Sequence, residues 1–337
     1  MKTCLAIGDL FVPEALMREG LAPLGAHGFK IETAAFDVGD YDALQASCLR
    51  IEKNGPDSIA LDPVLRGRML EAELIAVHFC PVGKSFIESA PRLEIIGTCR
   101  TGMSNIDTGT AAEKGIPVVN ARGRLADAVA DFTVGLMICE VRNIARGHEA
   151  LRQGRWRRDY HNLGRIPDLP GYTVGLIGFG AIGRGVARRL AGFGMKLLAA
   201  DPFVSDATLA DLNVERVEID DLMRVSDFVS VHVDVRPETH NLVDRRRIGL
   251  MKPSAYFINT ARSEIVDEQA LIEALQQDRI AGAALDVFRQ EPPTPDHPLL
   301  KLDNVTLTPH MSGGSDDAFR RSPQILCRLI LDKLNSL

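Results

Sequence analysis

The sequence predicts an α/β protein with two parallel-sheet domains, and three observations support this fold class. The chain has 337 residues, which is more than one average domain holds and suits two. Short apolar runs alternate with helical patterns along most of the chain, which is typical of βαβ units. A glycine-rich turn lies between two such runs, within Val174–Asp201, and predicts a phosphate-binding site.

Residues 1 to about 100 predict the first parallel-sheet domain. The expected strands are Cys4–Ile7, Lys30–Ala34, Leu74–Val77 and Leu93–Thr98. The expected helices between them lie near Glu14–Ala26, Asp42–Asn54 and Lys84–Ala90. This part of the chain has no glycine fingerprint, so we do not expect it to hold a nucleotide.

A further strand and a long helix follow. Ile116–Asn120 has the apolar character of a buried strand. From Ala126 to Leu151, apolar residues recur every three or four positions, which predicts one long amphipathic helix. The pattern then breaks at Gly154–Trp156, and a polar, irregular segment continues to Pro170.

The glycine-rich turn is the sequence G-x-G-x-x-G, formed by Gly178, Gly180 and Gly183. It follows the apolar run Thr173–Ile177 and opens a helix, and a second strand then ends on Asp201. Gly178 allows a tight turn, Gly180 lets a pyrophosphate approach the backbone, and Gly183 lets the helix pack closely. Free N–H groups at the helix start would face the phosphates. The carboxylate of Asp201 would accept hydrogen bonds from the adenosine ribose.

The alternation continues to the end of the chain. The expected strands are Phe228–Val233, Ala255–Asn259, Ala281–Leu285 and Val305–Thr308. The expected helices are Asp221–Arg224, Asp244–Leu250 and Asp267–Gln277, the last capped by Asp267. The final segment, Asp316 to Leu334, predicts an amphipathic helix that Pro323 interrupts early.

Composition excludes several classes of protein. Hydrophobic residues make up 45% and charged residues 25%, and the net charge of −6 comes without a charged tail, so we expect no nucleic-acid partner. Six scattered cysteines without a C-x-x-C motif indicate neither a metal site nor a disulfide framework. The first residues have no signal-peptide pattern, and no apolar stretch reaches membrane-spanning length. We therefore expect a cytoplasmic protein.

Three polar residues follow strands in the half of the chain that carries the fingerprint. They are Arg262, Glu291 and His310. Carboxyl ends of parallel strands share one sheet edge, so a cation, a carboxylate and an imidazole are expected together beside a nucleotide. This set suits reduction of a 2-keto acid, because a cation can polarise the carbonyl and an imidazolium can supply the proton. The carboxylate would orient the imidazole and favour its charged form.

The sequence resembles the D-isomer-specific 2-hydroxyacid dehydrogenases along nearly its whole length. The motifs that carry the resemblance are Gly102-Met103-Ser104-Asn105-Ile106-Asp107, Val118-Val119-Asn120-Ala121, Val129-Ala130-Asp131-Phe132, the glycine fingerprint, Ile258-Asn259-Thr260-Ala261-Arg262, Asp286-Val287-Phe288 with Glu291-Pro292, and Thr308-Pro309-His310. The resemblance implies hydride transfer between NAD(H) and a 2-hydroxy or 2-keto acid. Arg262 would bind and polarise the substrate, and His310 paired with Glu291 would be the general acid and base.

The resemblance also implies further site residues. The expected cofactor contacts are Gly178, Gly180, Ala181, Ile182, Gly183, Asp201, Thr260 and Asp286. Backbone N–H groups near Thr101 and Gly102 would bind the substrate carboxylate together with Arg262 and His310. No metal is expected. Asp201 would repel a 2′-phosphate, and Pro202-Phe203 offers no cation to neutralise one, so NAD(H) is the expected cofactor.

For the fold, the resemblance implies two domains of Rossmann or flavodoxin type with an active-site cleft between them. A discontinuous substrate domain would comprise residues 1–106 and 309–337. An NAD-binding domain, residues 107–308, would be inserted between these segments. The long helix near 126–151 resembles the one that family members use to form a homodimer.

Alternative functions stay open at this point. Phosphoglycerate dehydrogenases tend to have arginines near residues 76–81, but this loop, Ala76–Pro81, has none, although Arg100 could take that role. Ser104 and Ser263 stand where the family often has Asp and Gly, and neither change removes a catalytic group. Formate dehydrogenases pair the histidine with glutamine, so Glu291 argues against that activity. An NAD(H)-sensing binding protein would keep the same site. The motifs predict that the substrate is a 2-hydroxy or 2-keto acid, but they do not identify which one.

Overall fold

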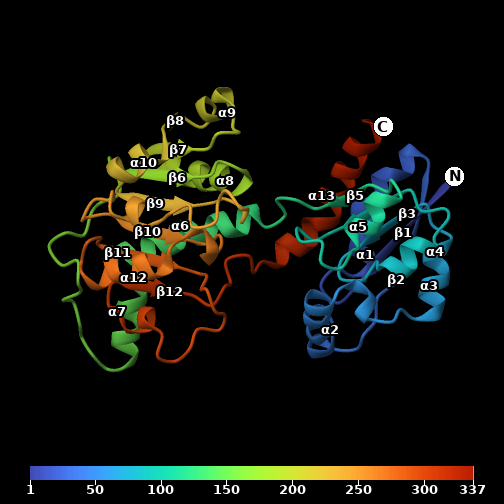
Figure 1. Ribbon diagram of the computed structural model, residues 1–337, viewed down its shortest axis with the longest axis horizontal. Helices are drawn as coiled ribbons and strands as arrows, with labels where there is room; N and C mark the ends of the chain where they lie inside the picture. The colour runs from blue at the N-terminus through green and yellow to red at the C-terminus, as the bar shows by residue number, and fades with distance from the viewer. Residues whose placement is uncertain (337) are drawn as a thin grey trace. The chain divides into compact units, whose positions relative to one another are not determined.

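Two parallel β-sheets organise the computed structural model, which describes residues 1–336 (Figure 1). They belong to two compact units. Unit 1 comprises Met1–Arg124 and the segment from Ser315 onward, and unit 2 comprises Leu125–Gly314. The first boundary lies later than the residue 106 expected from the sequence, because strand β5 (Val118–Asn120) pairs with β4 (Ile95–Thr98) inside the sheet of unit 1.

Unit 1 has a five-stranded sheet in the order β2-β1-β3-β4-β5, with parallel pairing throughout. Its first three strands are β1 (Lys2–Gly8), β2 (Phe29–Ala35) and β3 (Leu74–Val77). Its helices are α1 (Glu14–Leu21), α2 (Tyr41–Asn54), α3 (Pro63–Leu70), α4 (Lys84–Ser89), α5 (Thr108–Glu113) and α13 (Asp316–Leu334). The strand order is that of flavodoxin-like sheets, in which ligands bind between the ends of the first and third strands.

Unit 2 has a seven-stranded parallel sheet in the order β12-β11-β10-β9-β6-β7-β8. The strands are β6 (Thr173–Ile177), β7 (Lys196–Ala200), β8 (Val214–Arg216), β9 (Phe228–Val231), β10 (Tyr256–Asn259), β11 (Gly282–Leu285) and β12 (Val305–Leu307). The helices are α6 (Ala126–Val141), α7 (Ile144–Arg152), α8 (Ala181–Leu190), α9 (Asp206–Ala210), α10 (Ile219–Val225), α11 (Arg245–Ile248) and α12 (Glu268–Gln276). This is the Rossmann strand order, and the direction in which successive strands are added reverses beside β6.

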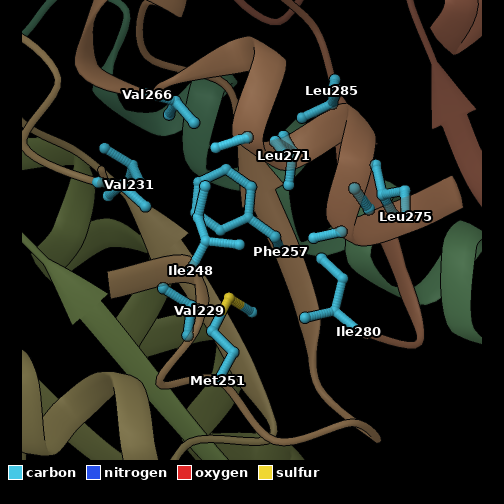
Figure 2. Packing of buried hydrophobic residues seen from close by; sticks show 14 of the residues in the cluster. Val229, Val231, Ile248, Met251, Phe257, Val266, Leu271, Leu275, Ile280 and Leu285 are labelled. Carbon is cyan, nitrogen blue, oxygen red and sulfur yellow. The ribbon is translucent and has the colours of Figure 1, made fainter. Parts of the chain in front are cut away.

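The strands of unit 2 are apolar because helices cover both faces of the sheet. On one face, Phe257 of β10 packs among Val229, Leu271 and Leu285 (Figure 2). α12 begins where expected, since the carboxylate of Asp267 accepts a hydrogen bond from the backbone N–H of Ala270 at 3.0 Å. The predicted fold class, two parallel-sheet α/β domains, is confirmed.

The predicted long helix from 126 to 151 is wrong in one respect. α6 ends at Val141, and α7 begins at Ile144. Between them Asn143 adopts a left-handed backbone conformation with φ 56°, and its side-chain amide donates to Asn162 Oδ1 at 2.7 Å. The long-range bond holds the chain in a conformation that a helix cannot include.

The apolar stripe of α6 is internal core rather than a free surface. Val134, Met137 and Val141 are buried and belong to the cluster that packs on the sheet of unit 2. The expectation that this stripe faces a partner subunit is therefore corrected: the chain covers the stripe itself.

The C-terminal helix α13 is continuous, although the sequence predicted an interruption at Pro323. Proline cannot donate to the carbonyl of Phe319, four residues earlier. The hydroxyl of Ser322 donates to that carbonyl instead, at 2.7 Å. Gly20 of α1 has no side chain at the point where Pro323 approaches, so α1 and α13 pack closely.

Candidate active site

The glycine-rich turn has the geometry that its sequence predicts. Gly178 has φ 92°, and a Cβ there would lie 2.6 Å from the carbonyl oxygen of His232. A Cβ on Gly180 would meet nothing within 4 Å, so the start of α8 is open to an approaching group. A Cβ on Gly183 would collide with the carbonyl oxygen of Gly178. The turn therefore needs glycine at positions 178 and 183, while the open space at Gly180 fits a pyrophosphate at the helix N-terminus.

Asp201 follows β7 at the next position along this edge. Its carboxylate accepts hydrogen bonds from the backbone N–H groups of Phe179, at 2.7 Å, and Phe203, at 2.8 Å. Arg216 is a nearby cation that the sequence analysis missed. Its guanidinium donates to the carbonyl oxygens of Asp201 and Val204 and to the carboxylate of Asp206, at 2.6 to 2.8 Å. These bonds engage the cation with oxygen atoms other than those of the Asp201 carboxylate.

Three other expected cofactor contacts lie near the same sheet edge. Ala181 is exposed and Ile182 half-buried in the first turn of α8. Thr260 follows β10 and is buried, with its hydroxyl 2.7 Å from that of Thr133 in α6. Because Thr133 donates its proton to the carbonyl of Val129, Thr260 is the donor in the pair of hydroxyls.

Asp286, the last of the expected cofactor contacts, follows β11. It is fully buried, and its carboxylate accepts hydrogen bonds from the hydroxyl of Thr308 at 2.7 Å and from the backbone N–H groups of Met311 and Ser312 at 2.9 Å. Its carbonyl oxygen accepts from the N–H of His310 at 2.9 Å. Asp286 therefore fixes the loop that carries His310.

The structure brings His310 and Glu291 together. Nδ1 of His310 lies 2.7 Å from Oε2 of Glu291, and both side chains are about two-fifths exposed. The other oxygen of Glu291 accepts from the N–H of Phe288 at 3.1 Å. His310 has a left-handed backbone with φ 48°, which its loop enforces. The histidine is thus oriented through Nδ1, and Nε2 is left for another partner.

A cavity of about 370 Å³ adjoins this pair within unit 2. Besides His310 and Glu291, its lining is mainly apolar and includes Phe288, Leu300 and Leu307. An apolar wall strengthens the hydrogen bond and charge interactions of the pair by reducing the local dielectric constant.

Arg262 follows β10, which pairs with β11, and β11 in turn pairs with β12, so Arg262 joins the same edge as Glu291 and His310. Its side chain is exposed and donates to the carbonyl of Ala261 at 2.7 Å. The buried side chain of Asn259 fixes the backbone of the Ala261–Arg262 loop. It accepts a hydrogen bond from the N–H of Ala261 and donates one to the carbonyl of Arg262, both at 3.0 Å. The sequence analysis did not assign Asn259 a role; a buried amide at a strand end is the signal that could have done so.

Thr101 and Gly102 lie in unit 1, after β4, and both are exposed. The carbonyl oxygen of Thr101 accepts from Asn120 Nδ2 at 2.5 Å, which ties this loop to the end of β5. Neither backbone N–H donates to another residue in the part of the chain that the structure describes. Both donors are therefore available to a carboxylate.

Taken together, a Rossmann sheet with a glycine-rich strand–helix turn, a carboxylate after the next strand and an imidazole bonded to a second carboxylate are typical of a dinucleotide-dependent oxidoreductase. Residues 134–312 match the family model of the D-isomer specific 2-hydroxyacid dehydrogenase, NAD binding domain. The chain therefore belongs to this family, and it is an NAD-linked oxidoreductase of 2-hydroxy acids.

Individual relatives agree with this assignment. The chain is 41% identical to a glyoxylate reductase of Thermofilum pendens over 73% of each chain. It is 40% identical to a D-3-phosphoglycerate dehydrogenase of Methanocaldococcus jannaschii over 78% of this chain, but over only 50% of that protein. A D-lactate dehydrogenase of Aquifex aeolicus, complexed with NAD and lactic acid, has a similar structure with a TM-score of 0.65 and 26% identity, over 99% of this chain and 96% of that one.

No described helix is both long and apolar enough to cross a membrane.

Proposed function

We propose that the protein reduces a 2-keto acid to the corresponding 2-hydroxy acid with NADH, and catalyses the reverse oxidation with NAD, through His310, Glu291 and Arg262. The observation that carries the proposal is the 2.7 Å contact between His310 Nδ1 and Glu291 Oε2. A carboxylate that is hydrogen-bonded to one imidazole nitrogen fixes the ring and favours its protonated form, which suits the other nitrogen to proton transfer.

In this proposal each residue acts on a defined part of the substrate. The N–H groups of Thr101 and Gly102 and the guanidinium of Arg262 bind the carboxylate, and Arg262 also polarises the keto oxygen. His310 donates the proton on Nε2 to that oxygen during reduction, and it removes the hydroxyl proton during oxidation. Glu291 keeps the ring oriented and compensates its positive charge. When bound, NADH supplies the hydride that is added to the keto carbon.

For the cofactor site, we propose contacts to Gly178, Gly180, Ala181, Ile182, Gly183 and Asp201, with Thr260 near the nicotinamide end. The open Cβ position of Gly180 and the negative charge at Asp201 support this assignment. Asp286 would act indirectly, by holding the His310 loop in place.

We further propose that the protein is a cytoplasmic homodimer. Large apolar side chains are exposed on α7 and the segment after it: Ile144, Leu151, Trp156, Leu163 and Ile166 are each at least 42% exposed. Such a concentration on one stretch of chain is typical of a surface that another subunit covers. The six free cysteines support a reducing compartment.

A turnover screen tests the main proposal. The purified protein would be assayed with NADH and glyoxylate, hydroxypyruvate, pyruvate, branched keto acids and sugar-derived keto acids. Oxidation of NADH with at least one acid, and its loss in His310→Ala, is the expected result. Binding of NADH without turnover of any acid would contradict the proposal and favour a sensing role.

A further inference from the structure

Arg289 lies two residues before Glu291, on the loop that follows β11. Its side chain is exposed, yet one of its nitrogens forms two hydrogen bonds to distant parts of the chain. Nη2 donates to Oδ1 of Asn241 at 2.7 Å and to the backbone carbonyl of Val266 at 3.0 Å. Both acceptors are neutral and the donor is charged, so these bonds are stronger and more directional than a surface ion pair.

The first acceptor, Val266, closes the short helical turn Ser263–Ile265, which begins directly after Arg262. The N–H of Val266 donates to the carbonyl of Ser263 at 3.0 Å. The side chain of Val266 is buried in the same core cluster as Phe257 (Figure 2). The carbonyl that accepts from Arg289 is therefore anchored in the core, one short turn away from Arg262.

The second acceptor, Asn241, is attached to the same turn. Its backbone N–H donates to the carbonyl of Glu264 at 2.8 Å. Asn241 has a left-handed backbone conformation with φ 49°, which asparagine adopts more readily than most residues. Arg289 therefore holds the turn after Arg262 both directly and through Asn241.

The backbone of Arg289 is held as well. Its N–H donates at 3.2 Å to Oε2 of Glu268, the first residue of α12. Only Gln290 separates Arg289 from Glu291, so a displacement of Arg289 would move the carboxylate that contacts His310. The contacts of Arg289 thus join the loop that carries Glu291 to the turn that follows Arg262.

A carboxylate compensates the positive charges in this region. Glu264 accepts a hydrogen bond from the hydroxyl of Ser263 at 3.1 Å. The pKa of Glu264 is lowered first by its own backbone N–H, and also by the Ser263 hydroxyl and the charges of Arg289 and Arg262. Two guanidinium groups can therefore occupy the same edge of the sheet without uncompensated repulsion.

We propose that Arg289 is a positioning residue for the reaction, because it fixes the loop that carries Glu291 relative to the turn that follows Arg262. The inference rests on the proposed function, in which Arg262 binds the substrate and Glu291 orients His310. Binding and proton transfer act on the same substrate, so their relative placement matters. A misplacement of about 1 Å can cost about 100-fold in rate.

Steady-state kinetics of Arg289→Gln test the proposal, with NADH and either glyoxylate or hydroxypyruvate. We expect kcat/KM to fall about tenfold, mainly through a higher KM for the keto acid, because Arg262 is no longer held in place. The KM for NADH should stay unchanged, since the glycine-rich turn follows a different strand, β6. Arg289→Lys keeps the charge and should recover part of the loss. Arg279→Gln changes an exposed arginine between α12 and β11, and this matched control should leave kcat/KM unchanged.

A double-mutant cycle tests whether Arg289 acts through its contact with Asn241. Asn241→Gly removes the accepting side chain, and glycine adopts the left-handed conformation of this position without strain. Alone, it should lower kcat/KM about threefold. In the Arg289→Gln background it should have little further effect, because the bond that it removes is already absent. Fully independent effects of the two substitutions would contradict the proposal.

Binding of oxamate separates this inference from the proposed function. Oxamate has the carboxylate and the carbonyl of a keto acid, but its amide is not reduced, so its dissociation constant from the protein with bound NADH reports binding alone. We expect Arg289→Gln to weaken oxamate binding about tenfold and Arg279→Gln to leave it unchanged.

Three outcomes would decide between the two proposals. Turnover with kinetics that are unchanged in Arg289→Gln overturns the positioning role and leaves the proposed function standing. A lower melting temperature of Arg289→Gln with unchanged kinetics also overturns it, because the arginine would then only stabilise the fold. Oxamate binding that depends on Arg289, without turnover of any acid, contradicts the proposed function and supports the positioning of Arg262 by Arg289.

Discussion

Nδ1 of His310 lies 2.7 Å from Oε2 of Glu291, a residue 19 positions earlier in the chain. The loops after two neighbouring strands, β11 and β12, bring the two side chains together. Asp286 fixes the loop that carries His310. Its backbone carbonyl accepts a hydrogen bond from the N–H of His310, and its carboxylate accepts from the N–H groups of Met311 and Ser312. His310 is therefore held at Nδ1 by the carboxylate of Glu291 and at its backbone N–H by the carbonyl oxygen of the buried Asp286.

The first prediction concerns Glu291→Gln. The amide keeps the shape of the carboxylate but removes its charge, so the charge-assisted hydrogen bond that orients His310 becomes a weaker neutral one. We expect kcat/KM to fall about tenfold or more in both directions, because the ring is held less firmly for proton transfer. The measurement is kcat/KM of reduction and of oxidation at pH 7, and unchanged values in a folded variant would mean that Glu291 does not orient His310.

A second prediction separates the roles of His310 and Arg262. His310→Ala should lower kcat by roughly 1,000-fold in both directions, because the proton donor and acceptor is lost. Arg262→Ala should raise KM and lower kcat together, with kcat/KM reduced at least about 100-fold, while Arg262→Lys should recover part of it. Steady-state kinetics with one keto acid would show this. A normal KM in Arg262→Ala would argue against substrate binding by this residue.

A third prediction concerns cofactor choice. Asp201 would lie beside a 2′-phosphate, and the nearby Arg216 is already bonded to three oxygen atoms. Since like charges in proximity cost several kcal/mol, kcat/KM should favour NADH over NADPH by about 100-fold or more. Asp201→Asn should reduce this ratio at least about tenfold. Equal use of both cofactors by the unaltered protein would refute the assignment of Asp201.

A fourth prediction concerns assembly. If α7 and the segment after it form the subunit interface, the protein should sediment as a dimer at micromolar concentration. Leu151→Glu and Trp156→Glu place charges on side chains that are 60% and 83% exposed, and they should shift the equilibrium to monomer without unfolding the protein. Val64→Glu, on an equally exposed apolar residue of α3, is the matched control. A monomeric unaltered protein would refute the interface.

The fifth prediction concerns stability in acid. Burial lowers the pKa of His161 from 6.5 to about 4. The unfolded chain therefore binds a proton at this residue between these pH values while the folded chain does not, so the free energy of unfolding falls as the pH falls through that window. The full loss from His161 is on the order of 3 kcal/mol.

The neighbouring carboxyl of Glu140 changes the stability in the opposite direction with pH. A substitution of His161 is therefore needed to isolate the contribution of the histidine. Burial raises the pKa of Glu140, so its folded form holds a proton above pH 4.5 that the unfolded form releases. Its contribution to stability is present below that pH and is lost as the pH rises. Urea unfolding from pH 4 to 7 should show a flatter dependence in His161→Leu, whereas His148→Leu, at an exposed position on α7, should match the unaltered protein.

The parallel sheets were predictable because their signals are local. Each expected strand is an apolar run of strand length, and the glycines at 178, 180 and 183 have positions that only a tight strand–helix turn uses. Asp267 shows the same for a helix start, since a capping carboxylate bonds a backbone N–H three residues away. Neighbouring residues determine all of these features.

Long-range contacts set the features that the sequence analysis missed. The break between α6 and α7 depends on a bond from Asn143 to Asn162, and the continuity of α13 depends on the hydroxyl of Ser322. The hydrogen bonds of Asp286 could not be read from its neighbours, because their donors come from a loop 22 to 26 positions later.

Unit 1 is built from two separate segments of the chain, and this affects when its core can be completed during synthesis. Ile330 and Leu326 of α13 complete the core that contains Met17 and Leu21 of α1, so the first helix to leave the ribosome acquires its packing partner only after unit 2 has been made. Unit 2 is continuous in the chain and has no such delay. The core of unit 1 is therefore complete only after the inserted unit has been synthesised, and until then the side chains of α1 that pack on α13 lack this partner.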